Sequence, residues 1–174
     1  MRKLLAAAVA AILVSSGAQA AVVTVTFNLT SESGLGPTIG TMMFEDSSEG
    51  LRIMPSVKDL PPGKHGFHVH QNPDCGPKDK DGKSVPGLAA GGHFDPKGTG
   101  KHEGPKGKGH LGDLPLLNVE SDGMAWEEIV APHLKVSDLA GRSIMIHAGG
   151  DNFSDSPAPL GGGGGRIACG VVGK

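Results

Sequence analysis

The sequence predicts an all-β protein of about eight short strands, folded as an antiparallel sandwich or barrel and interrupted by two long loops. Three features of the chain support this fold class. Short segments alternate apolar and polar residues, and no 12-residue stretch after residue 20 shows a helical period. Glycine supplies 29 of the 174 residues, well above the usual share of about 7%, which favours short strands joined by many turns. A chain of this length suits one domain.

The first 20 residues have the layout of a secretory signal peptide. A basic start precedes an apolar run from Leu4 to Val14, and Ala18-Gln19-Ala20 provides a small-x-small cleavage site. The run is too short for a permanent membrane anchor. The residue directly after the expected cut is alanine, so there is no cysteine at that position to carry a lipid. We therefore expect residues 1–20 to be removed and residues 21–174 to form the exported domain. The alternative is a retained helix lying at the membrane surface.

The first strand is predicted at residues 22–30, where apolar residues alternate with threonine and asparagine as in a half-buried strand. Seven further segments have strand composition and lie between turn residues: 38–46, 50–57, 66–70, 114–119, 123–130, 142–147 and 166–172. One helical turn is expected at residues 136–141.

Two long irregular segments interrupt these strands, from Gln71 to Gly112 and from Ala148 to Gly165. Loops this long are uncommon in a small domain unless they bind something or are tied down. Each begins directly after a histidine that ends a predicted strand, His70 or His147. Both loops are therefore candidates for function.

Net charge excludes one broad class of partner. Without Arg2 and Lys3, 14 basic side chains face 18 acidic ones, so the exported domain carries a net charge of −4 with histidine neutral. This balance argues against a general binder of nucleic acid or of anionic membranes.

His68 and His70 share one face of a predicted strand, because residues two apart point the same way. Phe67 and Val69 then point into the core. Two imidazoles on one rigid strand form a bidentate metal site with little ordering entropy left to lose. His65 has the opposite parity, so we expect it to pack beneath this site with hydrogen bonds and not to bind the ion.

The first long loop adds three more histidines and a carboxylate among six glycines: His93, His102, His110 and Asp113. It has almost no apolar content, whereas a tetrahedral ion held by these side chains would fold it. Nitrogen and oxygen ligands without thiolates suit zinc. His147 is a further candidate ligand at a strand end, and His133 is expected at the surface because no other ligand type is its neighbour in the sequence.

The chain has two cysteines, Cys75 and Cys169. An even count in an exported protein predicts one disulfide, here closing a long loop. Two separate buried thiols are the alternative.

Five segments together resemble the copper/zinc superoxide dismutases, particularly the exported bacterial type: HGFHVH, GGHFDP, GKGHLGD, IHAGGD and GGGGRIACGVV. The likeness runs in unbroken order from about Val23 to the C-terminus, and GFHVH together with ACGVV is its most specific part. It implies a Greek-key β-barrel that dismutates superoxide to molecular oxygen and hydrogen peroxide. It also implies a periplasmic protein that protects the cell envelope from oxidative damage.

The resemblance also implies a role for individual positions. Copper would be held by His68, His70, His93 and His147. Zinc would be held by His93, His102, His110 and Asp113, with one ion of each metal per subunit. His93, as the bridge between the ions, and Arg166, which attracts the superoxide anion, would be the catalytic residues. Asp151 would join a copper-binding to a zinc-binding histidine, and Cys75 and Cys169 would form the family's intrasubunit disulfide.

Six loop lysines are candidates for guiding the anion toward this site: Lys78, Lys80, Lys83, Lys101, Lys106 and Lys108. They are equally compatible with ordinary solvated loop charges, since Asp79 and Asp81 lie among them.

Two other classes of function remain possible from the residues. A protein that stores or delivers copper or zinc would use the same ligands but would not need Arg166 or a bridging His93. A single-copper electron carrier needs a Cys–His–Met cluster, and Cys169 is followed by Gly-Val-Val. A monomer and a homodimer are both compatible with the chain, and Trp126 could lie in an interface or in the core.

Overall fold

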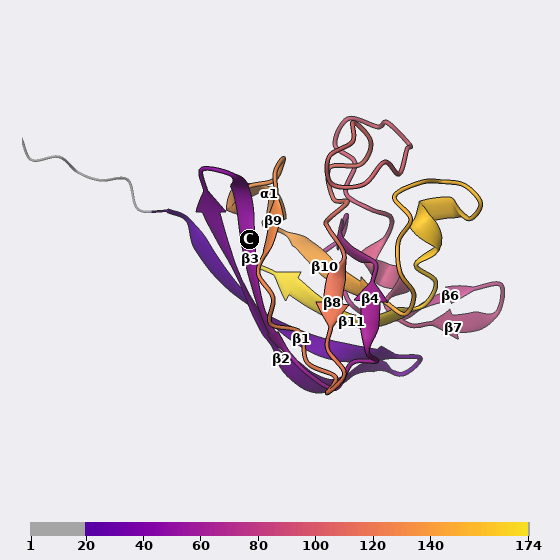
Figure 1. Cartoon of the computed structure of the whole chain (residues 1–174). Helices are drawn as coiled ribbons and strands as arrows, with labels where there is room; N and C mark the ends of the chain where they lie inside the picture. Colours follow the sequence, from indigo (N-terminus) through magenta and orange to yellow (C-terminus); the bar gives the residue numbers. More distant parts are fainter. Residues whose placement is uncertain (1–19, 174) are drawn as a thin grey trace, which may run out of the picture.

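One curled antiparallel sheet forms the body of the protein (Figure 1). The computed structural model describes residues 20–173, so the expected signal peptide lies, apart from Ala20, outside the described residues. Within that range seven strands form the sheet in the order β5-β10-β11-β1-β2-β3-β9. Their bounds are β1 Val22–Ser31, β2 Gly34–Ser47, β3 Gly50–Val57, β5 Phe67–His70, β9 Ile129–Ala131, β10 Arg142–His147 and β11 Arg166–Val172.

Smaller elements lie outside this sheet. Strands β4 (Gly63–His65) and β8 (Leu117–Val119) pair with each other, as do β6 (Lys78–Lys80) and β7 (Lys83–Val85). The short helices are η1 (Leu88–Ala90), α1 (Val136–Leu139) and η2 (Pro159–Gly162). No helix of the described chain is both long and apolar enough to cross a membrane.

The predicted all-β class is confirmed, and so is the helical turn, which is α1. Sheet neighbours that are distant in the sequence, such as β11 beside β1 and β5 beside β10, provide the crossovers of a Greek-key arrangement. The predicted strands at 114–119 and 123–130 are shorter than expected, at three residues each. Within the second of these, Ala125 forms only an isolated bridge, with Val57.

The first long loop is not structureless throughout, because it contains the β6–β7 hairpin. Its turn is Asp81-Gly82, and both residues have positive φ, 55° and 74°. An Asp-Gly pair with this conformation forms the two-residue turn that joins antiparallel strands most readily. The hairpin lacks apolar alternation, so the strand pattern missed it, although the Asp-Gly pair was a usable signal.

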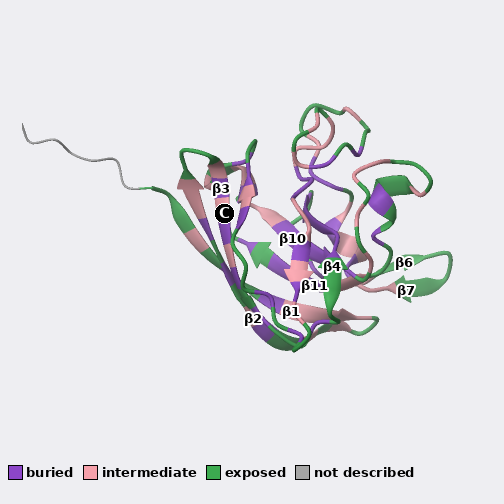
Figure 2. Ribbon diagram, viewed as in Figure 1, coloured by how far each residue is buried: buried purple, intermediate pink, exposed green. Residues whose placement is uncertain are grey.

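The core lies inside the curled sheet, and Figure 2 shows residues coloured as buried along its strands. Phe27, Phe44 and Phe67 are fully buried and come from three different strands. Burying one such side chain stabilises a fold by about 1.5–3 kcal/mol. Trp126 is not part of this core, since it is 61% exposed.

The two long loops lie together at one side of the sheet (Figure 1). The backbone N–H of His102 in the first loop donates to the Asp155 carboxylate in the second, at 2.9 Å. A side chain at Gly104 would collide with the ring of Phe153. The loops therefore pack on each other and enclose the space beside β5 and β10.

Candidate metal centre

Strand β5 places His68 and His70 inside the protein, and both are completely buried. Phe67 and Val69 belong to the apolar core, as the alternation predicts. His147 ends β10, which pairs with β5. Two paired strands thus supply three histidines to one place.

The first long loop folds back onto β5 and supplies the remaining ligand types. His93 forms an isolated β-bridge with His70, and Asp113 forms one with His68. His102 is buried as well, at 2% exposure. Residues that lie far apart in the sequence are therefore brought into one cluster.

Two compact groups of potential ligands occur in the described residues, each with its ligand atoms within 4.8 Å of one another. The four-histidine group is His68, His70, His93 and His147. The aspartate group is His68, His93, His102 and Asp113. His110, expected from the resemblance beside Asp113, lies at the edge of this second group, with its Nδ1 atom 3.4 Å from Asp113 Oδ1.

Backbone carbonyl groups fix the orientation of two rings in the four-histidine group. His70 Nδ1 donates to the carbonyl oxygen of Gly91 at 3.0 Å, and His147 Nδ1 donates to that of Gly164 at 3.3 Å. Both rings therefore present an unprotonated Nε2, and these two atoms are 3.4 Å apart. Two lone pairs facing each other at this distance repel, whereas a cation between them would be bound by both.

His93 lies between the two groups. Its Nδ1 atom is 2.9 Å from Asp113 Oδ1, which leaves Nε2 for the group that contains His70 and His147. Its ring stacks on that of His68, with 3.9 Å between the centroids. One imidazole can therefore serve both groups, each through a different nitrogen.

Asp151 joins the two groups from the second long loop. Its Oδ2 accepts a hydrogen bond from His68 Nε2 at 2.7 Å, and its Oδ1 accepts one from His102 Nε2 at 2.8 Å. Both rings must then direct Nδ1 inward. A single carboxylate thus sets the tautomer and orientation of one histidine on each side.

Burial determines the protonation of most of these rings. It lowers the pKa of His93 to about 4 and that of His147 to about 3, and it lowers the pKa of His70 well below the usual range. The cause is the loss of water around the charged imidazolium. These three rings are therefore neutral at pH 7 and offer lone pairs to an ion.

His102 behaves differently. Burial by itself would lower its pKa, but the neighbouring carboxylates of Asp113 and Asp151 outweigh burial and raise it to about 9. Burial would raise the pKa of both carboxyl groups, but their histidine contacts hold each pKa well below its ordinary value. A divalent ion in the aspartate group would replace the proton of His102 as the positive charge beside the carboxylates.

The atoms left without hydrogen-bond partners show that a metal fits. Four buried atoms of the cluster have none: His68 Nδ1, His102 Nδ1, His110 Nδ1 and Asp113 Oδ2. His102 Nδ1 and Asp113 Oδ2 are 2.9 Å apart but not aligned as a hydrogen bond. A buried group with no partner, such as His68 Nδ1, costs about 1–3 kcal/mol. Imidazole nitrogens and a carboxylate oxygen suit copper and zinc, which would satisfy these atoms.

Arg166 begins β11 and lies beside the four-histidine group. Its Nη1 donates to the Gly87 carbonyl at 2.6 Å, and its Nη2 donates to the Gly91 carbonyl at 2.7 Å. Gly91 is also the acceptor for His70. Burial lowers the pKa of Arg166, but a guanidinium remains charged at neutral pH. These partners belong to the first long loop and not to the glycine run 161–165.

The predicted disulfide between Cys75 and Cys169 is confirmed. Cys169 lies in β11, three residues after Arg166, and Cys75 lies in the first long loop. Next to Cys75, the Gly76 carbonyl accepts a hydrogen bond from Ala89 of η1 at 3.1 Å. The disulfide therefore fastens the loop that carries the carbonyl partners of Arg166.

His65 is buried below the cluster, as expected. Its Nδ1 is 2.7 Å from the His147 carbonyl oxygen and its Nε2 is 2.7 Å from that of Pro61. It is therefore engaged with backbone oxygens and does not face the cluster.

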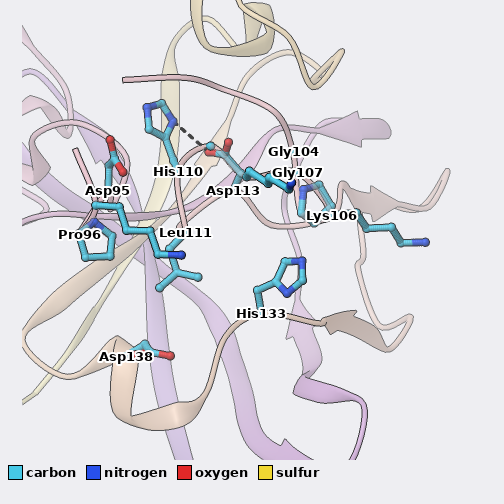
Figure 3. Close-up of a pocket in the computed structure, with 14 residues that line it drawn as sticks. Asp95, Pro96, Gly104, Lys106, Gly107, His110, Leu111, Asp113, His133 and Asp138 are labelled. Carbon is cyan, nitrogen blue, oxygen red and sulfur yellow. Dashed lines mark ion pairs between the residues drawn. The ribbon is translucent and has the colours of Figure 1, made fainter. Parts of the chain in front are cut away.

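His133 is exposed, as expected, but it does have ligand types as neighbours in space. It lines a cavity of about 720 Å³ together with His110, Asp95 and Asp138. Figure 3 shows His110 at this cavity, on the side toward Asp113, and its Nδ1 atom is 3.4 Å from Asp113 Oδ1. The sequence could not reveal this proximity, because the cavity lies between the first long loop and the segment around α1.

Comparisons with known proteins agree with this geometry. A family model described as copper/zinc superoxide dismutase matches residues 38–172. The Cu-Zn superoxide dismutase 2 of Salmonella typhimurium is 53% identical over 171 residues, covering 98% of this chain and 99% of that protein. The solved Cu/Zn superoxide dismutase from Brucella abortus has a TM-score of 0.86 at 51% identity, covering 87% of this chain and 99% of that one. The solution structure of the monomeric copper, zinc superoxide dismutase from Salmonella enterica has a TM-score of 0.79 at 54% identity, with the same coverage.

Proposed function

The chain belongs to the copper/zinc superoxide dismutase family, and from this we propose a role for each residue of the site. Copper is held by His68, His70, His93 and His147. Zinc is held by His93, His102, His110 and Asp113, with one ion of each metal per subunit. The enzyme dismutates superoxide to molecular oxygen and hydrogen peroxide, and it uses copper and zinc for this.

One observation carries the assignment, namely the position of His93 between the two groups. His68 also belongs to both groups, but its Nε2 atom donates to Asp151. His93 directs Nδ1 toward Asp113, which leaves its Nε2 atom for the four-histidine group. A protein that only stores metal would not need this shared ring. Copper, when bound, supplies the one-electron oxidation and reduction that dismutation requires. Since two superoxide anions and two protons give one oxygen and one hydrogen peroxide, the site must also deliver protons, and His93 Nε2 is the atom that can hold and release one.

Arg166 binds the substrate in this proposal. Two of its N–H groups are committed to the Gly87 and Gly91 carbonyls, which hold the guanidinium in place. Its remaining donors have no hydrogen-bond partner among residues 20–173 and can bind a small anion. The hydrogen bonds to Gly91 from both Arg166 and His70 keep the anion-binding group in fixed relation to a copper ligand.

Six loop lysines draw superoxide toward Arg166 although the exported domain is acidic. None of Lys78, Lys80, Lys83, Lys101, Lys106 and Lys108 forms an ion pair within the described residues. Their ammonium groups therefore remain available to attract an anion, and they add to the field around the loops.

We also propose export to the periplasm after cleavage behind Ala20, where the enzyme protects the cell envelope. The N-terminal residues have the required basic, apolar and small-residue layout. Cell fractionation with N-terminal sequencing tests this, and a mature protein that begins at Ala21 is expected. Recovery of the full-length chain from the cytoplasm would contradict it.

A monomer is the proposed assembly, by analogy with the Salmonella enterica relative, whose solution structure is that of a monomeric enzyme. Trp126 offers a direct check, because it is the only tryptophan and is 61% exposed. Sedimentation should give a single subunit, with tryptophan emission typical of an exposed indole. A dimer that buried this side chain would shift the emission with concentration.

The ligand assignment is tested by metal counting and copper EPR on the exported form and on His93→Gln. The unaltered protein should hold one copper and one zinc and remove superoxide. The variant should lose zinc affinity and change the copper spectrum together, because one ring serves both ions. If only one of the two metals responded, the shared role of His93 would be wrong.

A further inference from the structure

Arg142, the first residue of β10, contacts the neighbours of two proposed copper ligands. Its guanidinium carbon lies 3.4 Å from the centre of the Phe94 ring. Its Nη1 atom donates to the carbonyl oxygen of Gln71 at 3.2 Å. Gln71 directly follows His70, and Phe94 directly follows His93. One side chain therefore touches both segments that carry these histidines.

The two segments lie against each other over a very short contact. The Gln71 N–H donates to the Gly92 carbonyl at 3.0 Å, and the Phe94 N–H donates to the Val69 carbonyl at 2.8 Å. The β-bridge between His70 and His93 lies between these bonds. This pairing is not part of a longer ladder, so few backbone bonds hold it.

Phe94 is the side chain that anchors the loop here. It is 8% exposed and belongs to the apolar core cluster. The chain beyond it, from Asp95 to Gly112, is rich in glycine and lysine and contributes only Leu111 to that cluster, as a partly buried neighbour. Arg142 covers the ring of Phe94, while its Nε donates to the Asp138 carbonyl of α1 at 3.0 Å. The guanidinium is thus fixed from a third side.

We propose that Arg142 is a positioning residue for this enzyme, which holds His93 against His70 before any metal binds. The planar guanidinium stacks on Phe94 with its face and donates to backbone oxygens with its edge. A lysine ammonium cannot do both, because it has no flat face and no fixed donor geometry. The inference rests on the proposed roles of His70 and His93 as metal ligands.

Arg142→Lys tests it, with Arg52→Lys as the matched control. Arg52 lies on β3 and pairs with Glu45 and Glu128, away from the cluster. In the metal-free protein we expect amide exchange at Phe94 and Gln71 to become about tenfold faster in Arg142→Lys, with the β1–β2 amides unchanged. In the loaded protein we expect zinc release to a chelator to become about tenfold faster and the copper EPR spectrum to change. The control should stay within about twofold on each measurement.

Phe94→Leu provides an independent variant, because it removes the ring and keeps an apolar side chain. If stacking carries the effect, this variant should reproduce the local change in exchange, and the double variant should add little to either single one. The role of Arg142 is overturned if exchange at Phe94 and Gln71 is unchanged, if all amides accelerate together, or if the two substitutions act independently. Exchange is measured without metal, so a failure of the ligand assignment would appear only in zinc release and EPR.

Discussion

Gly161 lies against Asp151 with no room for a side chain between them. A Cβ atom on Gly161 would overlap the Asp151 carboxylate and come within 2.9 Å of His102 Nε2. Gly161 also has a φ of 72°, a conformation that L side chains rarely adopt. This glycine therefore leaves open the space in which Asp151 joins His68 to His102.

Gly161→Ala should displace the Asp151 carboxylate and weaken zinc binding by about tenfold. Gly82→Ala is the matched control, because its φ is 74° and nothing lies within 4 Å of an added Cβ atom. Both variants should lose about 1–2 kcal/mol from backbone strain, but only the first should lose zinc affinity, measured by competition with a chelator. Equal zinc affinity in the two variants would show that the contact with Asp151 has no consequence.

Asp151→Asn should weaken zinc binding by about 10- to 100-fold. An amide offers one acceptor oxygen, so it can accept from His68 or His102 but not from both, and its NH₂ group would face the other ring. The control is Asp122→Asn in a remote turn, where one oxygen accepts from the Met124 N–H. Zinc titration with a colorimetric chelator measures the difference. A variant that retained full zinc affinity would show that Asp151 does not orient the zinc ligands.

Replacing both cysteines by serine should lower stability by about 2–4 kcal/mol, measured by urea unfolding. It should also lower kcat/KM by about tenfold, equivalent to about 1.4 kcal/mol, because the bond fastens the loop whose carbonyls hold Arg166. Zinc content should fall in the same variant. If the protein without the disulfide kept its zinc and its full rate, the disulfide would not be needed to hold Arg166 and the metal ligands in place.

The metal-free protein should be most stable near pH 6.5. Burial lowers the pKa of His93 to about 4 and that of His147 to about 3, whereas the same groups titrate near 6.5 when unfolded. As the pH falls below 6.5 the unfolded chain binds more protons than the folded one, so stability falls. His102 has the opposite effect on stability, because its pKa is raised to about 9. Its ion pairs are lost as the pH rises from 6.5 to 9, so stability falls over that range as well. Urea unfolding at pH 5, 6.5 and 8.5 with a chelator present checks both sides, and stability that rose steadily to pH 9 would contradict this balance.

The rate of dismutation should fall as salt rises, because electrostatic attraction of an anion is screened. Changing Lys78, Lys80 and Lys83 together to glutamine should lower the rate at low salt by about tenfold and flatten its salt dependence. Stopped-flow measurement of superoxide decay is the assay. A rate that is independent of salt in the unaltered protein would exclude guidance by the loop lysines.

The strands that the sequence predicted well are those with a clear apolar or alternating composition, and β1 is the plainest case of alternation. In β1, Val25 and Phe27 are buried while their neighbours are more exposed, and this alternation is visible in the residues alone. The short strands β4, β6 and β7 were not predicted. Each is three residues long, and the pairing of such strands depends on turns and contacts more than on apolar pattern.

The candidate ligands could also be found in the sequence, because histidines two apart on a strand and a polar loop rich in histidine are unusual. Residue spacing does not divide them into two groups. The resemblance implied that division, and the contacts that produce it are visible only in the structure. The division depends on which nitrogen of each ring is engaged by Gly91, Gly164 or Asp151. These partners come from segments far apart in the chain. The stacking of Arg142 on Phe94 also joins distant segments, so the sequence could not show it either.

The amino-acid sequence by itself determined the all-β class, the disulfide, the set of histidines and the family resemblance, because these follow from local alternation, residue type and spacing. The resemblance implied that His93 is shared and that Asp151 joins two histidines. Only the tertiary structure decided which atoms make these contacts and that Gly161 leaves room for the Asp151 carboxylate. Those relations arise when two loops with little apolar content pack on each other beside β5 and β10. Their positions depend on long-range contacts that no short window of sequence contains.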